Sequence, residues 1–168
     1  MAGRRAKLSL MTPRDATPAD IDPLADLWHA GWRDAHLDLL PAEVAADRTL
    51  QSFRERLTAN LARVRTIGDI AHPLGFTWIK GDELNQFYVA AEARGQGVAA
   101  TLMADAEARM KATGVTKAWL DCAIGNLRAA RFYEKSGWRR AGTVTIDVTL
   151  TTGTRPFEVW RYEKTPQG

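Results

Sequence analysis

The segment with the clearest chemistry in this sequence is a glycine-containing turn between an expected strand and an expected long helix. Residues 88–99 read YVAAEARGQGVA, with Gly95 and Gly97 just before the expected helix. The first N–H groups of a helix have no partner within the helix and lie at the positive end of its dipole. The two glycines let the backbone approach an anion closely, and Arg94 adds a positive charge. The segment therefore predicts a site for phosphate groups.

Two common phosphate-binding motifs do not fit this turn. The Lys-Ser/Thr ending of a P-loop is absent, and the third glycine of a dinucleotide fingerprint is missing, as is an acidic residue at the end of a second parallel strand. A glycine at such a turn can also serve only to permit the backbone conformation. The turn alone therefore leaves a purely structural interpretation open.

Around this turn the chain resembles the GNAT superfamily of N-acetyltransferases. The central motif of that family is Arg or Gln, two variable residues, Gly, one variable residue, and then Gly or Ala; Arg94, Gly97 and Ala99 match it. In the family, the backbone amides of this turn hold the pyrophosphate of acetyl-CoA. The resemblance therefore implies that acetyl-CoA binds around Arg94, Gly95, Gln96, Gly97, Val98, Ala99 and Thr101.

A second segment, residues 126–138, reads NLRAARFYEKSGW and looks like the family's later block of Asn, Ala, Phe-Tyr and Gly-Phe. Trp138 stands in the final aromatic place of that block. Taken one by one, Asn126 could be only a helix N-cap, Gly137 only a C-cap, and Phe132 and Trp138 only core residues. Two blocks in the family's order are more specific than either block alone. The resemblance covers residues 84–141 strongly and the first helices loosely.

Tyr133 is the first candidate for a catalytic side chain. The departure of coenzyme A produces a thiolate that needs a proton, and a phenol can supply one. The resemblance places this Tyr near the thioester sulfur, with Asn126 bonding the pantetheine arm and Phe132 packing beside it. The alternative is that Tyr133 is a half-buried packing residue.

The strand expected at residues 84–89 should supply backbone groups to the cofactor. Because side chains alternate on a strand, Glu83, Asn85, Phe87 and Val89 are expected on one face, toward the reaction centre. The resemblance implies that the backbone near Phe87 and Val89 pairs with pantetheine. The N–H of Val89 is expected to polarise the thioester carbonyl.

The sequence departs from the family pattern at the position expected for the proton acceptor of the amine. Many family members have a Glu four residues before the Val89 position, where this chain has Asn85, and an amide cannot accept a proton at neutral pH. Glu83 is two residues earlier, roughly 6.6 Å farther along a strand, and water could bridge that distance. Glu83 is the candidate base; the alternatives are an exposed Glu without a role and direct loss of the proton to water.

Three further residues could lie near the acceptor. Trp28, Trp32 and His36 recur every four residues on the first expected helix, so they could line a pocket for a cationic amine. A core role is the preferred interpretation for the two tryptophans, and a surface or capping role for His36. Cys122 has no His near it in the sequence and belongs to an apolar strand, which favours a buried structural thiol over a nucleophile.

The elements expected to position these residues follow from periodicity and turn residues. Helices are expected from about 20 to 35, from 43 to 64, from 98 to 113 and from 126 to 136; strands are expected at 8–11, 66–70, 75–79, 84–89, 116–122, 143–150 and 157–162, the last two joined by a turn at 151–154. This order predicts an α/β (α+β) fold with a mixed, mostly antiparallel sheet flanked by helices. Its length of 168 residues with 45% hydrophobic residues indicates one domain, 1–168.

Composition excludes several other kinds of site. One cysteine allows no intrachain disulfide, and three scattered histidines show no metal-ligand spacing, so no metal is expected. The net charge of +3 comes from interspersed acids and bases, with one basic cluster at residues 4–7, so no nucleic-acid partner is expected. No run approaches the roughly 20 apolar residues of a membrane span. A cytoplasmic protein without membrane association is expected, and a homodimer is plausible by resemblance only.

The sequence as a whole predicts an N-acetyltransferase. It would move an acetyl group from acetyl-CoA to the primary amine of a small molecule or peptide by direct attack in a ternary complex. The absence of the family Glu at Asn85 keeps a second interpretation open, a non-catalytic module that binds acyl-CoA as a sensor. The acceptor has no diagnostic motif.

Overall fold

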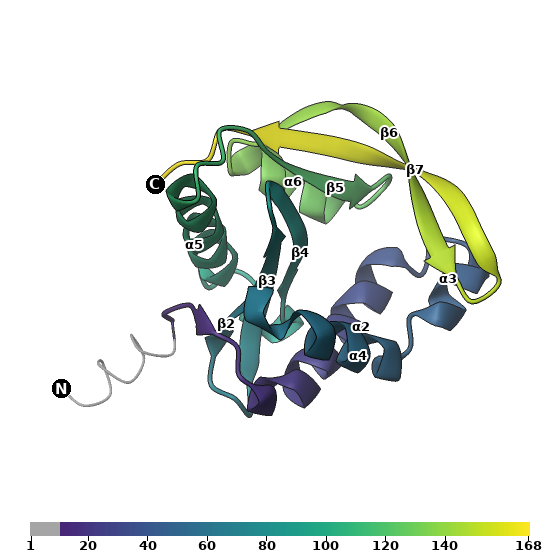
Figure 1. Cartoon of the computed structure of the whole chain (residues 1–168), viewed down its shortest axis with the longest axis horizontal. Helices are drawn as coiled ribbons and strands as arrows, with labels where there is room; N and C mark the ends of the chain where they lie inside the picture. The colour runs from purple at the N-terminus through teal and green to yellow at the C-terminus, as the bar shows by residue number, and fades with distance from the viewer. Residues whose placement is uncertain (1–10) are drawn as a thin grey trace.

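A seven-stranded sheet forms the centre of residues 11–168, the part of the chain that the computed structural model describes (Figure 1). Its order is β1-β2-β3-β4-β5-β7-β6. The strands are β1 (Arg14–Asp15), β2 (Val64–Gly68), β3 (Pro73–Lys80), β4 (Glu83–Val89), β5 (Ala118–Ala123), β6 (Arg139–Leu150) and β7 (Gly153–Lys164). Neighbouring strands are antiparallel except β4 and β5. The predicted mixed, mostly antiparallel α/β sheet is confirmed.

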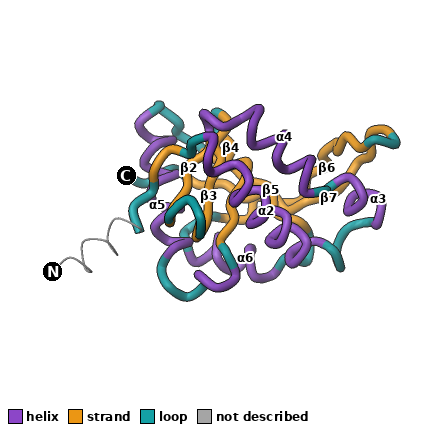
Figure 2. Tube along the Cα trace, turned by 90° about the horizontal axis from the view of Figure 1, so that it is seen from below, coloured by secondary structure: helices purple, strands orange, loops and turns teal. Residues whose placement is uncertain are grey.

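Helices cover both faces of this sheet (Figure 2). They are α2 (Ile21–His36), α3 (Ala42–Asp47), α4 (Leu50–Asn60), α5 (Val98–Ala112) and α6 (Leu127–Lys135), with short 3-10 turns η1 (Pro18–Asp20), η2 (Leu61–Arg63) and η3 (Ala91–Ala93). None of the helices in residues 11–168 has the length and apolar character that a membrane crossing requires. On one face, Trp28 of α2 and Phe53 of α4 pack against Phe76 and Trp78. On the other face, α5 and α6 pack against β4, β5 and β7.

The two central strands touch at one end and then separate. Their only registered pair is Glu83 with Trp119, and the N–H of Trp119 donates to the Asp82 carbonyl at 3.0 Å. Beyond this point β5 stays paired with β7, while β4 stays paired with β3 (Figure 1). The facing edges of β4 and β5 therefore separate, which opens a gap in the middle of the sheet.

A β-bulge in β4 changes which side chains share a face. Trp78 pairs with Gln86 and the next residue, Ile79, pairs with Leu84, so Asn85 is an extra residue on β4. The extra residue reverses the alternation. Glu83 therefore lies on the same face as Gln86 and Tyr88, toward α2, whereas Phe87 and Val89 face α5 and α6. The prediction that Glu83 shares a face with Phe87 and Val89 is wrong, because simple alternation cannot anticipate a bulge.

Two other predictions about local structure differ from the structure. The segment expected as one helix from 43 to 64 is divided into α3, α4 and η2, and Val64 already belongs to β2. Thr49 starts α4 as its N-cap by accepting from the N–H of Ser52 at 3.1 Å. Asp47, at the end of α3, accepts from the N–H and the hydroxyl of Thr151 at the β6–β7 tip, which lies beside α3 (Figures 1 and 2).

The strand expected at 8–11 lies outside the described residues except Met11, which is in a turn.

A buried carboxylate joins β1 to the start of α2. The side chain of Asp20 is fully buried and accepts from both terminal nitrogens of Arg14, at 2.8 and 2.7 Å. It also accepts from the N–H and the hydroxyl of Thr17, at 2.8 and 2.9 Å. The hydrogen bonds from Arg14 are the main reason why the pKa of Asp20 lies below its ordinary value. The ionised form is therefore the one that stabilises the fold.

The substitution Asp20→Asn is expected to lower the free energy of unfolding by about 2–3 kcal/mol at pH 7, because it removes a buried charge that Arg14 requires. The native pKa is depressed, so this contribution is present above the ordinary pKa of Asp and is lost as the pH falls through the native value. Urea unfolding at pH 7 and pH 3 should show the difference between wild type and variant shrinking in acid. Asp26→Asn, at an exposed position of α2, should change little at either pH.

Candidate active site

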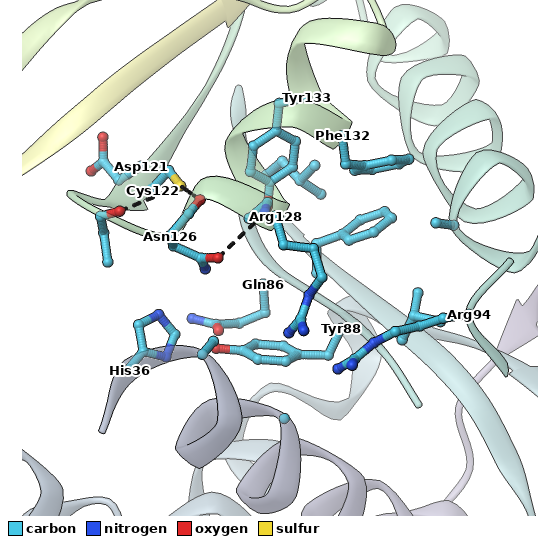
Figure 3. A pocket seen from close by; sticks show the side chains of 18 of the residues that line it. His36, Gln86, Tyr88, Arg94, Asp121, Cys122, Asn126, Arg128, Phe132 and Tyr133 are labelled. Atoms are coloured by element: carbon cyan, nitrogen blue, oxygen red, sulfur yellow. Dashed lines mark hydrogen bonds between the residues drawn. The ribbon is translucent and has the colours of Figure 1, made fainter. Parts of the chain in front are cut away.

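A cavity of 330 Å³ lies between β4, β5, α2, α6 and the turn that precedes α5 (Figure 3). It occupies the gap where β4 and β5 separate. The predicted site residues that line it are Phe87, Val89, Arg94, Gly95, Ala99, Asn126, Phe132 and Tyr133. The structure therefore brings together residues from the two sequence blocks, which are separated by the whole of α5 and β5.

The remaining predicted cofactor residues do not line the cavity. Gly97 is the N-cap of α5, and the side chain of Val98 is buried in the core. The side chain of Gln96 donates to the Glu92 carbonyl at 2.8 Å, and the hydroxyl of Thr101 donates to the Gly97 carbonyl at 2.9 Å. Because these side chains do not reach the cavity, residues 96–98 can contact a ligand through their backbone N–H groups.

The turn before α5 has the backbone geometry of an anion site. Gly95 and Gly97 have φ values of 73° and 81°, in the left-handed region that favours glycine. The first helical bond runs from the N–H of Thr101 to the Gly97 carbonyl at 3.0 Å, so the N–H groups of residues 98–100 precede the helical hydrogen-bond ladder. They lie at the positive end of the helix dipole, where an anion is stabilised.

Two arginines at this end of the cavity share one carboxylate. Arg94, from the turn, and Arg128, from the first turn of α6, both donate to the same oxygen of Asp34 on α2, at 2.9 and 2.8 Å. The hydrogen bond from Arg128, followed by that from Arg94, lowers the pKa of Asp34. Both arginines line the cavity. No sequence motif marks Arg128 or Asp34, although Arg128 lies only two residues after Asn126.

The backbone of β4 offers unused hydrogen-bonding groups to the cavity. The N–H of Ala90 donates to the Leu74 carbonyl at 2.9 Å. In an antiparallel ladder, hydrogen-bonded and non-hydrogen-bonded pairs alternate, so the next pair, Val89 with Gly75, is a non-hydrogen-bonded pair. The N–H and carbonyl of Val89 therefore point away from β3, toward the gap between β4 and β5. A ligand in the gap can pair with them.

Aromatic side chains form the α6 wall of the cavity. The ring of Phe87 stacks on that of Phe132 at 5.3 Å and meets the edge of the Tyr133 ring at 6.4 Å. Burial raises the pKa of Tyr133, so its phenol is protonated at neutral pH. The side-chain oxygen of Asn126 accepts from the N–H of Ala129 at 3.3 Å, which leaves its NH₂ group for a ligand.

Cys122 also lines the cavity, but its chemistry is that of a buried thiol. Burial raises the pKa of Cys122 to about 11, so the thiolate is scarce at neutral pH. Its sulfur lies 3.7 and 3.8 Å from the backbone oxygens of Ala123 and Asn126. The prediction of a buried thiol is confirmed.

The α2 side of the cavity carries polar residues that the sequence motifs did not mark. They are Gln86, Tyr88 and Asp121, together with His36, which the helical spacing on α2 had offered as a possible pocket residue (Figure 3). The carboxylate of Asp121 accepts two hydrogen bonds from Arg161, at 2.5 and 3.3 Å. Side chains alternate along β5. Because Cys122 faces α6, Asp121 is expected on the opposite face, toward α2.

The tryptophans of α2 belong to the core. Trp28 and Trp32 are buried and pack with α4 and β3, and neither lines the cavity. The core interpretation of these two residues is confirmed. His36 lines the cavity, so a purely surface role is not confirmed, whereas its Nδ1 lies 2.9 Å from the Trp32 carbonyl oxygen in the last turn of α2, as a capping role predicts.

Glu83 lies outside the cavity but is connected to it. The Asn85 amide donates to the Glu83 carboxylate at 3.0 Å, and the Gln86 amide donates to the Asn85 oxygen at 3.0 Å. Asn85 and Gln86 line the cavity, and Glu83 does not. Burial is the main reason why the pKa of Glu83 is raised.

Comparison with known proteins shows the family of this chain. The family model described as "Acetyltransferase (GNAT) family" matches residues 25–138, more than half of the chain. An uncharacterized N-acetyltransferase of Mycobacterium tuberculosis is 33% identical over 108 residues, which cover 61% of this chain and 69% of that protein.

Two solved structures share the fold at low sequence identity. A GCN5-related N-acetyltransferase from Rhodopseudomonas palustris has a TM-score of 0.70 at 21% identity, covering 92% of this chain and 94% of that one. The PaiA N-acetyltransferase from Thermoplasma acidophilum, solved in complex with coenzyme A, has a TM-score of 0.71 at 18% identity, covering 91% and 97%. The cavity between the separated strands, next to the N-terminus of α5, is consistent with this fold. The family match identifies the chain as a member of the GNAT family of acetyltransferases, an acyltransferase enzyme.

Proposed function

We propose that this enzyme transfers the acetyl group of acetyl-CoA to the primary amine of a small molecule or peptide, by direct attack in a ternary complex. The observation that carries the proposal is the continuous cavity, which joins the anion-binding turn before α5 to the unpaired backbone of β4 and to Tyr133. Coenzyme A in the Thermoplasma acidophilum structure supports the assignment of the cofactor.

The cofactor would lie across the gap with its phosphates at the turn. Arg94 and the backbone N–H groups of residues 95–99 would hold the pyrophosphate, with Thr101 at the edge of this site. The pantetheine arm would pair with the backbone of β4 near Phe87 and Val89, as an added strand does, and with the free NH₂ of Asn126. Phe132 would pack beside the arm. These contacts place the thioester near Val89 and Tyr133.

The chemistry requires an oxyanion donor and an acid. The N–H of Val89 points into the gap and would stabilise the oxyanion that forms when the amine attacks the thioester carbon. Tyr133, whose phenol is protonated, would supply the proton for the departing thiolate. Glu83, the sequence-derived candidate base, does not line the cavity; its carboxylate accepts from the Asn85 amide, and a proton from the amine could reach it only through water.

The substitution Gly97→Glu is expected to weaken acetyl-CoA binding at least about 100-fold, because it puts a side chain into a left-handed position and a negative charge beside the phosphates. Isothermal titration calorimetry with acetyl-CoA measures this change. Gly114→Glu is the matched control, since Gly114 has a φ of 87° and lies just beyond the other end of α5. Equal losses in both variants would indicate a general effect on α5 and contradict the proposed phosphate site.

The substitution Tyr133→Phe is expected to lower kcat about 100-fold or more while acetyl-CoA affinity stays close to that of wild type, because only the proton donor is lost. Thiol release from acetyl-CoA with a panel of amines measures the rate. Tyr162→Phe is the control, because Tyr162 is also buried but does not line the cavity. If wild type binds acetyl-CoA and releases no thiol with any amine, the chain is a binding module instead.

A further inference from the structure

His36 is a cavity residue that the proposed mechanism leaves without a role. It is the last residue of α2, and its ring reaches the cavity from the wall opposite to the one that α6 forms (Figure 3). The ring also lies on that of Trp32, with centroids 5.1 Å apart. Because Trp32 is buried in the core, this contact fixes the position of the imidazole.

The hydrogen bond of His36 determines which ring nitrogen carries the proton. Nδ1 lies 2.9 Å from the backbone carbonyl oxygen of Trp32. A carbonyl oxygen only accepts, so Nδ1 must donate, and Nε2 of the neutral ring keeps its lone pair. No other hydrogen bond or ion pair of His36 occurs in residues 11–168. Nε2 is therefore a free acceptor.

The surroundings of the ring favour its neutral form. Burial is the main cause that lowers the pKa of His36, and the positive charge of Arg48, between α3 and α4, lowers it further. The bond to the Trp32 carbonyl acts in the opposite direction. The other polar groups on this side of the cavity are Gln86 and Tyr88 of β4 and Asp121 of β5. The charge of Asp121 is compensated by its ion pair with Arg161.

The other titratable groups that line the cavity are unsuited to accept a proton. Burial raises the pKa values of Tyr88, Tyr133 and Cys122, so all three hold their protons at neutral pH. Asp121 already accepts two hydrogen bonds from Arg161. Among the described cavity-lining residues, His36 is thus the neutral base with a free lone pair.

We infer that Nε2 of His36 is the general base that takes the proton from the acceptor amine, an inference that rests on the proposed acetyl transfer. An ammonium R–NH₃⁺ gives one proton to Nε2, and the resulting R–NH₂ attacks the thioester carbon, so that a C–N bond forms and the carbonyl oxygen becomes negative. Collapse of this intermediate breaks the C–S bond. The nitrogen loses its second proton to solvent. Tyr133 protonates the thiolate and then takes a proton from solvent, and His36 releases its proton to solvent.

The pH dependence of kcat/KM with an active amine tests this role. Because the base works when deprotonated, kcat/KM of wild type should rise with pH through a limb whose midpoint lies below the ordinary His pKa. His36→Gln should lose this limb and about 100-fold in kcat/KM at pH 7.5, while its affinity for acetyl-CoA is kept. Imidazole added to His36→Ala should restore part of the rate, which a purely structural role would not allow.

Two comparison variants make the test specific. His29→Gln changes a histidine of the same helix that lies beside Phe53 and does not line the cavity, so it should keep the wild-type profile. Because Glu83 does not line the cavity and is not the base under this inference, Glu83→Gln should also keep the limb. If Glu83→Gln removes the limb and His36→Gln keeps it, Glu83 is the base and the inference is overturned.

NMR of ¹⁵N-labelled histidine gives a readout that needs no turnover. At pH 7, His36 should be neutral with the proton on Nδ1; a doubly protonated ring or a proton on Nε2 would overturn the inference. The kinetic outcomes separate the two claims. If wild type binds acetyl-CoA but acetylates no amine, both the proposed function and the role of His36 are refuted. If wild type is active and His36→Gln has an unchanged pH profile, only the role of His36 is refuted.

Discussion

The separation of β4 and β5 is the constraint on which the site depends. Backbone N–H and carbonyl groups inside a protein cost free energy when they have no partner, so two adjacent strands do not part in a core without a reason. Here β4 is held by β3 and β5 by β7, while different cores cover the two faces of the sheet. The unpaired edge of Val89 is thereby kept open for a ligand that pairs with it as a strand would.

Charge is distributed unevenly along the cavity that this separation opens. Arg94 and Arg128 converge on Asp34 at one end, so a phosphate that binds there must compete with a carboxylate for the same two guanidinium groups. At the other end, the charge of Asp121 is compensated by Arg161, and His36 is neutral. One end is thus suited to an anion, and the other has the low net charge that the proposed attack by a neutral amine requires.

The sequence was most informative where the signal was local. Asn126 caps α6 and Gly97 precedes α5 with a positive φ. Most helices and strands that follow from periodicity are present, because each depends on residues close in the chain; the helix expected at 43–64 is the exception, since it is divided into α3, α4 and η2. The bulge at Asn85 could not be predicted, since it depends on the register between β3 and β4. For the same reason, the bridge from Asp34 to Arg128 joins residues far apart in sequence and had no motif.

Helix α2 links the two ends of the cavity. It carries Asp34, which accepts from the two arginines at one end, and His36, which lines the cavity at the proposed acceptor end two residues later. The helix is fixed by the burial of Leu24, Trp28 and Trp32 in the core. A base held by a rigid element loses little conformational entropy during reaction, and its distance from the thioester is set by packing. The tryptophans that sequence analysis considered for the acceptor pocket thus contribute by positioning the histidine that lines it.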